Sequence, residues 1–398
     1  MPAELSSPVP ATLAPLAHAD PLRPADTPGL LACLATIHDP RRASGRRHPL
    51  TAILAMAAAA VLTGARSVAA TAEWAADAPQ PVRAALGARR DAPNHWVVPA
   101  EATIRRTLER LGPTALAAAL GAWLADRDRP AQQRRRRAVA VDGKTLRGAR
   151  RAPDGRQVHL PAAMDHATRA VLAQRHVDGA PGEVPGLVPL LADLDLAGAC
   201  VTADALHTHA DAAELLATTK QADYLFTVKA NQPTLLDRCA AIPWQDVPVG
   251  GRTHDRGHGR VELRTLKAVT VNHFGFPHAA QVLQVTRKTR ELGTRRWRVV
   301  VVYAITSLPF ERASPARLAD LLRGHWAIEN GLHWVRDVTF AEDASQLRTG
   351  TGPQVMACLR NLAIGVLSRA GPVNLAAALR RHARDPARPL TTLGISLA

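Results

Sequence analysis

The run Ala-Val-Ala-Val-Asp at positions 138–142 ends on an acid, and Gly-Lys-Thr-Leu-Arg-Gly follows it at once. A second apolar run, Ala-Cys-Val-Thr-Ala-Asp at 199–204, ends in the same way. A third acid, Glu329, lies far downstream within a helical pattern. Two carboxylates at strand ends and one on a helix can bind a pair of divalent metal ions, and such pairs promote attack on phosphodiester bonds. Each acid taken alone is also a common helix cap or turn residue, and Asp204 is followed directly by a helical pattern.

The order of the expected elements around the first two acids is that of an α/β fold. Three strands, a helix, a strand, a helix and a strand follow one another, which is the order of a ribonuclease-H-like mixed sheet. This order places Asp142 at the end of the first strand and Asp204 at the end of the fourth. The strands are expected at 138–142, 159–164, 170–177, 199–204 and 223–229, and the helices at 184–194 and 209–219.

A β-rich insertion is expected at about 245–310, before the helix that contains Glu329. Strand patterns cover 260–271, 280–288 and 295–306, and the apolar run at 299–303 predicts a central strand. Ser314 as N-cap and proline at the first helical position predict the start of the Glu329 helix. One further helix is expected at 353–369.

The flanking regions differ from this catalytic domain, which we expect to span 138–371. Residues 1–28 are rich in proline and are predicted to be a disordered tail, and 372–398 are predicted to be a C-terminal tail. Residues 29–130 have helical patterns and are expected to form an N-terminal domain that binds DNA. The apolar run at 50–64 is too short for a membrane span and predicts a buried helix. The helix expected at 99–111 fits a DNA-contacting helix-turn-helix and a plain amphipathic helix with solvated arginines equally well.

The net charge indicates a polyanionic partner. The chain has 398 residues, a formal net charge of +16 and a pI near 11.1, which is typical of proteins that bind nucleic acid. A basic but otherwise ordinary enzyme is the alternative. The four cysteines have no paired spacing, and no secretory signal or membrane span is visible. These features predict a cytoplasmic protein.

The segment around Glu329 is dense in functional side chains. His325, Glu329, His333 and Asp337 are four residues apart, so a regular helix would place them on one face. Histidines at this spacing can also bind zinc, although the His-Glu-x-x-His order of metalloproteases is absent. A solvated face with the two neighbouring tryptophans in the core is the third alternative.

Two other segments mix polar and basic residues. The stretch 255–264 has glycines among bases, and it predicts either a phosphate-contacting turn or the entry to a hairpin. Lys-Ala-Asn-Gln at 229–232 follows the fifth strand, and it predicts either a substrate contact or a helix cap at Asn231.

Several motifs together resemble those of bacterial insertion-sequence transposases of the DDE type, in the subgroup that includes the H-repeat-associated proteins of Rhs elements. The resemblance covers about 30 to 371. Three short motifs at 39–42, 45–50 and 64–67 are similar to the helical associated domain of that family. The motifs of the catalytic domain are Val-Asp-Gly-Lys-Thr-Leu-Arg-Gly at 141–148, Thr-Ala-Asp-Ala at 202–205, Lys-Ala-Asn-Gln at 229–232, His-Gly-Arg-Val-Glu at 258–262 and His-Trp-Ala-Ile-Glu-Asn-Gly-Leu-His-Trp-Val at 325–335.

The resemblance implies Asp142, Asp204 and Glu329 as catalytic residues and as ligands of two Mg²⁺ ions, for which Mn²⁺ would substitute. It implies double-stranded DNA as the partner, both at the transposon ends and at the target, and a homodimer on DNA in the nucleoid. The chain departs from the family pattern in the last helix, where Leu322, His325 and Arg336 replace a tyrosine, an arginine and a lysine.

Further residues are expected to contact DNA or to replace a ligand. The candidate DNA contacts are Lys144, Arg147, Lys229, Arg260, His325 and Arg336. The fallback acids, should Glu329 not be a ligand, are Asp337, Glu342 and Asp343. A nuclease that cuts without joining, and a domesticated DNA-binding protein without catalysis, are the competing functions.

Overall fold

The computed structural model describes residues 29–132, 137–150, 157–176, 187–257, 259–369 and 374–397. The expected tail at 1–28 and most of the basic linker at 134–137 lie outside these ranges. The chain divides into two compact units. The first comprises Met1–Arg134, Gly143–Gly179 and Glu329–Ala398, and the second comprises Arg135–Asp142 and Ala180–Ile328.

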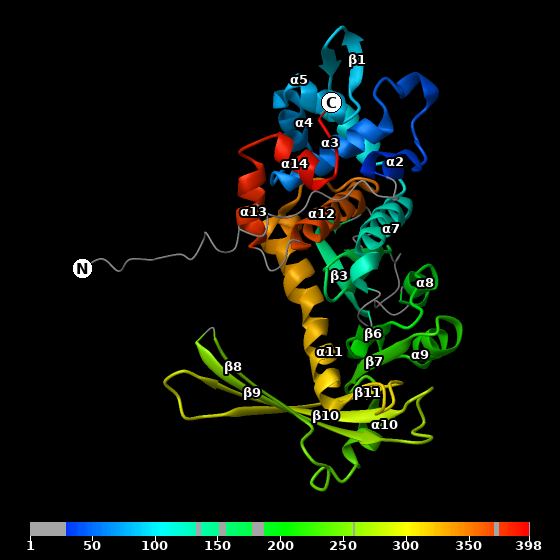
Figure 1. Ribbon diagram of the computed structural model, residues 1–398, viewed down its shortest axis with the longest axis vertical. Helices are drawn as coiled ribbons and strands as arrows, with labels where there is room; N and C mark the ends of the chain where they lie inside the picture. The colour runs from blue at the N-terminus through cyan, green and yellow to red at the C-terminus, as the bar shows by residue number, and fades with distance from the viewer. Residues whose placement is uncertain are drawn as a thin grey trace, which may run out of the picture. The chain divides into compact units, whose positions relative to one another are not determined.

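The first unit is mainly helical (Figure 1). Its helices are α2 (Leu30–Ala35), α3 (Leu50–Leu62), α4 (Val68–Asp77), α5 (Gln80–Ala85), α6 (Glu101–Leu108), α7 (Pro113–Gln132), α12 (Gly352–Ser368), α13 (Leu375–His382) and α14 (Ala387–Thr392). Two π-helical turns, η5 (Glu329–His333) and η6 (Val335–Thr339), and the 3₁₀ turns η1 (Ala43–Gly45) and η7 (Glu342–Ala344) belong to it as well. Its strands are β1 (Arg89–Ala92), β2 (His95–Val97), β4 (Gln157–Asp165) and β5 (Val171–Gln174).

Helix α3 forms the centre of this unit because its sequence is apolar all round. Every residue from Ala52 to Leu62 is buried, and the alanines combine high helix propensity with a small side chain that lets other helices approach. α3 contacts α2, α4, α12 and α14, and α12 is likewise buried from Gly352 to Leu367. The buried helix expected at 50–64 is therefore confirmed. Nowhere in the described ranges does a helix have both the length and the apolarity that a membrane span requires.

Nine strands form one mixed sheet in the order β5-β4-β3-β6-β7-β11-β10-β9-β8. Strand β3 (Ala138–Arg150) belongs to both units, since the division falls after Asp142. It pairs in parallel with β6 (Cys200–Ala203), and β6 pairs in parallel with β7 (Asp223–Val228). The five strands predicted around the first two acids are thus present, in an α/β unit preceded by helices.

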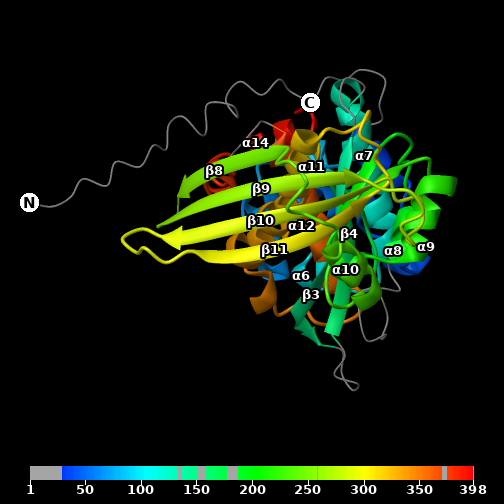
Figure 2. The same cartoon turned by 90° about the horizontal axis from the view of Figure 1, so that it is seen from below.

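The second unit contains the rest of the sheet and its own helices. The strands β8 (Gly251–Gly257), β9 (Arg260–Thr270), β10 (Gln281–Glu291) and β11 (Arg298–Thr306) lie side by side in antiparallel order (Figure 2). The helices are α8 (Leu187–Ala192), α9 (Ala210–Glu214), α10 (Pro233–Ala240) and α11 (Pro315–Ile328), with the 3₁₀ turn η3 (Ala205–His207) and the π-helical turn η4 (Leu215–Thr219). α11 begins at Pro315, as the sequence predicts, and its Leu318 and Leu321 pack with Leu225, Leu266 and Leu283 of the sheet.

Strand β3 differs from its prediction because it does not end at Asp142. It continues to Arg150. Leu146 and Ala149 pack in one apolar cluster with Val158 and Leu160 of β4, which accounts for the continuation. Asp142 is therefore the residue at which β3 leaves β6, not the end of the strand.

The valine-rich strand β11 also differs from its prediction. It lies between β7 and β10 in the sheet, but Val299, Val300 and Val301 are 53%, 38% and 46% exposed. The reason is that β7 pairs only with β11 residues from Tyr303 onward, so the valines have a partner strand on one side. The run is central in the order of strands but is not buried.

Three local elements escaped the sequence patterns. The hairpin β1–β2 lies within the region expected to be helical, and β8 pairs with β9, so the segment 255–264 enters a hairpin, as one of its two interpretations predicts. Residues 372–398, expected as a tail, contain α13 and α14. Leu375, Leu379 and Leu390 are buried, which supplies the apolar contacts that hold these short helices.

Candidate active site

Strand register brings Asp142 and Asp204 together. Val141 of β3 lies opposite Ala203 of β6, and the two strands are parallel. The residue that follows in each case is an aspartate, so Asp142 and Asp204 lie side by side at the point where β3 and β6 cease to pair. The ligand atoms of Asp142, Asp204 and His207 all lie within 4.8 Å of one another.

The turn after β6 fixes the position of Asp204. Its Oδ1 accepts a hydrogen bond from the backbone N–H of Leu206 at 3.0 Å and so caps the 3₁₀ turn η3. Residues three apart in a 3₁₀ turn stack one above the other, which brings His207 over Asp204. The side chain of His207 is fully buried. The cap that competed with a metal ligand at Asp204 is therefore present, but it uses Oδ1, and Oδ2 remains able to bind a cation.

Hydrogen bonds to the end of β7 and to the residues that follow it hold this turn in place. Thr208 Oγ1 donates to the carbonyl of Thr227 at 2.6 Å. Asn231 Nδ2 donates to the carbonyl of Ala205 at 2.6 Å, and Gln232 Nε2 donates to the carbonyl of Thr208 at 2.9 Å. Asn231 and Gln232 of the polar motif at 229–232 thus position the turn that contains Asp204 and His207, and the helix after the motif is capped at Gln232 and not at Asn231.

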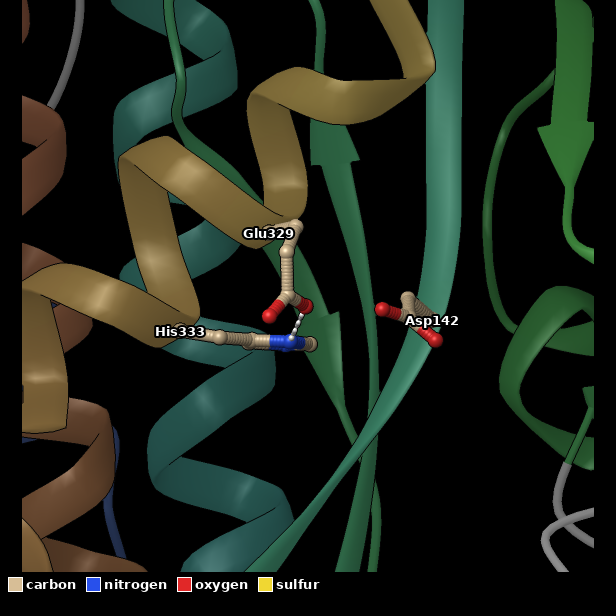
Figure 3. A group of neighbouring side chains, drawn as sticks. All are labelled: Asp142, Glu329 and His333. Atoms are coloured by element: carbon tan, nitrogen blue, oxygen red, sulfur yellow. Dashed lines mark hydrogen bonds and ion pairs between the residues drawn. The ribbon is translucent and has the colours of Figure 1, made fainter. Parts of the chain in front are cut away.

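Glu329 begins a distorted part of its helix. α11 ends at Ile328, and the π-helical turn η5 starts with Glu329. The side chain of Glu329 is 57% exposed, and its Oε2 is bonded to Nδ1 of the buried His333 at 3.2 Å. Figure 3 draws this hydrogen bond as a dashed line and also labels Asp142. Such π-helical turns are rare and occur frequently at functional positions.

The four polar residues spaced four apart take separate partners. His325 Nδ1 is bonded to Thr202 Oγ1 at 3.1 Å, and Asp337 Oδ1 is paired with Lys144 Nζ at 2.5 Å, while Glu329 is bonded to His333. Two π-helical turns interrupt the helix here, and the spacing of four keeps only Glu329 and His333 in contact, while His325 and Asp337 have partners elsewhere. This arrangement gives no support to a zinc site built from the four-residue repeat.

The two tryptophans of this segment lie at the surface. Trp326 is 52% exposed and Trp334 is 54% exposed. The alternative in which both tryptophans fill the core is therefore wrong. The apolar residues that do fill the core from this segment are Ile328, Leu332 and Val335.

Glu342 lies in a buried ion network and not in a ligand position. Its Oε2 accepts from Arg336 Nε at 2.8 Å, and its Oε1 accepts from Arg360 Nη1 at 2.8 Å. Burial alone would raise the pKa of this carboxyl, but the charges of Arg336 and Arg360 outweigh burial and hold the pKa below its ordinary value. Because guanidinium groups occupy both oxygens, Glu342 is excluded as a fallback ligand. Asp343 instead has Oδ2 4.0 Å from Arg147 Nε.

The structure divides the expected DNA contacts into two classes. Arg336 is fully buried and Lys144 is nearly so, and each is paired with a carboxylate. In this structure neither side chain is exposed to solvent, and a contact of either residue with a DNA phosphate stays a prediction. The side chain of Arg147 is 79% exposed, and Lys229 and Arg260 are also exposed.

The donor set beside the last paired residues of β3 and β6 fits a divalent cation. Carboxylate oxygens suit Mg²⁺ and Mn²⁺, and an imidazole nitrogen adds a donor that manganese and zinc accept more readily. Asp142, Asp204 and His207 supply both kinds of atom within 4.8 Å. Sequence patterns pointed to the two aspartates but not to His207. The available signal was its spacing of three from Asp204 in a short turn.

Comparisons with known proteins agree on one family. The model described as "Transposase DDE domain" matches residues 133–365, and the model described as "DDE_Tnp_1-associated" matches residues 31–124. The protein YbfL of Escherichia coli (strain K12) is 28% identical over 385 residues, which cover 93% of this chain and 97% of YbfL. The "H repeat-associated putative transposase YhhI" of the same strain is 29% identical over 276 residues, covering 65% of this chain and 71% of that protein.

One solved structure is similar over much of the chain. It is the piggyBac transposase in a synaptic complex with hairpin DNA, at 12% identity, with 92% of this chain and 77% of that chain covered. The TM-score is 0.38, which is too low to show a shared fold.

Proposed function

Because the chain belongs to the DDE transposase family, we propose that it binds the ends of its own insertion sequence and catalyses metal-dependent strand cleavage and strand transfer. The observation that supports this most is the register of β3 and β6. It brings Asp142 and Asp204 next to each other at the point where β3 and β6 cease to pair, with ligand atoms close enough to share a cation.

The strand order supports a ribonuclease-H-like catalytic core. Counted along the chain from β3, the part of the sheet from β5 to β7 has the order 3-2-1-4-5. The strands β8 to β11 come after this part and before Glu329, as an insertion at about 245–310 requires. We assign residues 138–371 to this domain, and residues 29–130 to a helical domain that holds the transposon ends.

Asp142, Asp204 and Glu329 are the proposed catalytic residues and metal ligands. A bound pair of Mg²⁺ ions, or of Mn²⁺ ions in their place, would activate water or a 3′ hydroxyl and stabilise the leaving oxygen. The hydrogen bonds from Leu206 N–H to Asp204 and between His333 and Glu329 would orient two of these carboxylates.

Exposed cations are proposed to bind the DNA backbone. Arg147, Lys229 and Arg260 are exposed, and the formal net charge of +16 favours a polyanion. His325 acts differently, because its bond to Thr202 ties α11 to β6, the strand that ends beside Asp204. Both ends of an element must be brought together for transposition, so we propose a homodimer on double-stranded DNA at the nucleoid.

The experiment is a cleavage and joining assay on DNA that carries the element's own end, with a target plasmid present. Wild type should cut and join in Mg²⁺ but not in EDTA. Asp142→Asn, Asp204→Asn and Glu329→Gln should lose both activities while they retain DNA binding. Asp237→Asn, which changes an exposed acid of α10, is the matched control and should behave as wild type.

Each of the other outcomes would change the function or the active-site residues assigned to the chain. Metal-dependent cutting without joined products would make the chain a nuclease. Tight binding of the end by wild type with no cutting would make it a DNA-binding protein. Undiminished cutting by Glu329→Gln would remove that residue from the active site.

A further inference from the structure

A buried histidine shares the turn that positions Asp204. The side chain of His207 is 0% exposed, and a ring nitrogen lies within 4.8 Å of carboxylate oxygens of both Asp142 and Asp204. The three proposed catalytic acids leave this imidazole without an assigned role. An imidazole next to two carboxylates and away from bulk water is a typical arrangement for a metal ligand.

The backbone keeps His207 in this position. The N–H of His207 donates to the carbonyl of Asp204 at 3.2 Å, which closes the 3₁₀ turn between the two residues. The side chains of Asn231 and Gln232 donate hydrogen bonds to the same turn on either side of His207. Asn231 donates to the carbonyl of Ala205, and Gln232 donates to the carbonyl of Thr208. A ligand held by its backbone loses little conformational freedom when it binds a cation, so the affinity is higher.

The neighbouring His209 differs from His207 in both its partner and its exposure. His209 is only two residues further on, but its Nε2 is bonded to the carbonyl of Leu206 at 2.9 Å and it is partly exposed. It is not a member of the group formed by Asp142, Asp204 and His207. Proximity in sequence therefore does not by itself place an imidazole at the carboxylates.

We infer that His207 binds the same cation as Asp142 and Asp204, and that this nitrogen donor raises the preference of the site for Mn²⁺ over Mg²⁺. The inference rests on the proposed function, since it concerns the metal site of the proposed transposase. Mg²⁺ takes oxygen donors almost exclusively, whereas Mn²⁺ lies higher in affinity at mixed oxygen and nitrogen sites. Neutral imidazole is the form that binds a metal.

The test is pulsed electron paramagnetic resonance of Mn²⁺ bound to the full-length protein, which detects a directly bonded ¹⁴N nucleus. The measurement is made in the His333→Ala background, because the ring of His333 lies beside Glu329 and would add a second nitrogen signal. We expect a ¹⁴N coupling in this background. His207→Gln should remove the coupling, while His209→Gln, the matched control, should retain it.

Affinity measurements provide a second readout. His207→Gln should lower the Mn²⁺ affinity by about tenfold or more, since loss of a group that only orients a ligand already costs about that much. The ratio of Mn²⁺ to Mg²⁺ affinity should fall as well. Glutamine retains a polar side chain of similar size, and an unchanged circular dichroism spectrum shows that the variant is folded.

The outcomes separate this inference from the proposed function. Mn²⁺ that binds and is lost in Asp142→Asn, but shows no ¹⁴N coupling, would overturn the role of His207 and leave the proposed function intact. A coupling that survives His207→Gln would also overturn it. If Asp142→Asn leaves Mn²⁺ binding unchanged, then the metal site of the proposed function is itself wrong.

Discussion

Glu329 and Glu342 lie in one stretch of chain, and their surroundings give them opposite tasks. Both oxygens of Glu342 are bonded to buried guanidinium groups, those of Arg336 and Arg360. Glu329 is 57% exposed and is bonded to the imidazole of His333. A buried carboxylate whose two oxygens are bonded to guanidinium groups cannot bind a cation, whereas an accessible carboxylate beside an imidazole can. The difference shows that partners, not residue type, separate a structural acid from a candidate ligand.

The same contrast between buried, paired groups and accessible groups applies to the lysine and arginine side chains. Arg336 and Lys144 are buried and paired with carboxylates, whereas Arg147 extends into solvent. Burial of an ion pair is tolerated only when the charges and hydrogen bonds are matched, and removal of one partner then leaves an uncompensated charge. Substitution of a buried, paired residue should therefore lower the stability of the fold. Substitution of an exposed residue should instead change metal or DNA binding.

The largest expected effect is on folding. Glu342→Gln should lower the free energy of unfolding by about 3–5 kcal/mol, because it leaves Arg336 and Arg360 buried without a counter-charge. Glu329→Gln should change that free energy by no more than about 0.5 kcal/mol, as is usual for an exposed side chain. Urea denaturation of both variants measures the difference. Equal destabilisation by the two substitutions would contradict the contrast.

Lowering the pH should remove part of the stabilisation that the Glu342 carboxylate provides. The pKa of Glu342 lies below its ordinary value of 4.5, because the two arginines outweigh burial. A group with a lowered folded-state pKa contributes stability above its unfolded pKa, and the contribution is lost as the pH falls through the folded-state pKa. Denaturation between about pH 6 and about pH 3 should therefore show the gap between wild type and Glu342→Gln becoming smaller. A gap that stays constant with pH would show that the carboxylate charge is not what stabilises the network.

A smaller effect is expected at the turn of Asp204. Asn231→Ala removes the hydrogen bond to the carbonyl of Ala205 and should cost about 1 kcal/mol of stability. It should also weaken Mn²⁺ binding, since the turn presents Asp204 and His207. Isothermal titration with Mn²⁺ measures this, and Asn272→Ala, an exposed asparagine after β9, should have no effect. Wild-type metal affinity in Asn231→Ala would show that the turn needs no such support.

The smallest effect is expected in the salt dependence of DNA binding. Arg147→Ala should reduce the slope of log affinity against log salt concentration by about 1, as loss of one phosphate contact does. Lys144→Met should leave the slope unchanged, because its ammonium group is paired with Asp337. Binding measured across a salt series distinguishes the two variants. A reduced slope in Lys144→Met would mean that this buried lysine does reach the DNA.

Much of the fold could be predicted from the sequence because its signals are local. The apolar runs that end at Asp142 and Asp204 predict strands, and two parallel strands that are neighbours in the sheet bring the ends of these runs together. The helix that begins at Pro315 was predicted from the cap Ser314 and the proline itself. Each of these signals lies within a few residues of the element that it predicts.

The remainder depends on contacts between distant residues. The burial of Arg336 follows from Arg360, Gln174 and Glu342, which the sequence does not bring together. The π-helical turns that interrupt the helix at the four-residue repeat have no sequence signature of their own. The hairpin β1–β2 turns at Asn94, whose φ of 57° is tolerated better by asparagine than by most residues, but this signal is weak by itself.

The most direct test of the central claim is the metal dependence of end cleavage by Glu329→Cys. If Glu329 is a metal ligand, a thiolate in its place binds Mg²⁺ poorly and accepts a softer cation more readily. We expect no cleavage of the element's end in Mg²⁺ and restored cleavage in Mn²⁺, with the variant folded and bound to DNA in both. Cleavage at the wild-type rate in Mg²⁺ would contradict the claim that Glu329 holds the metal.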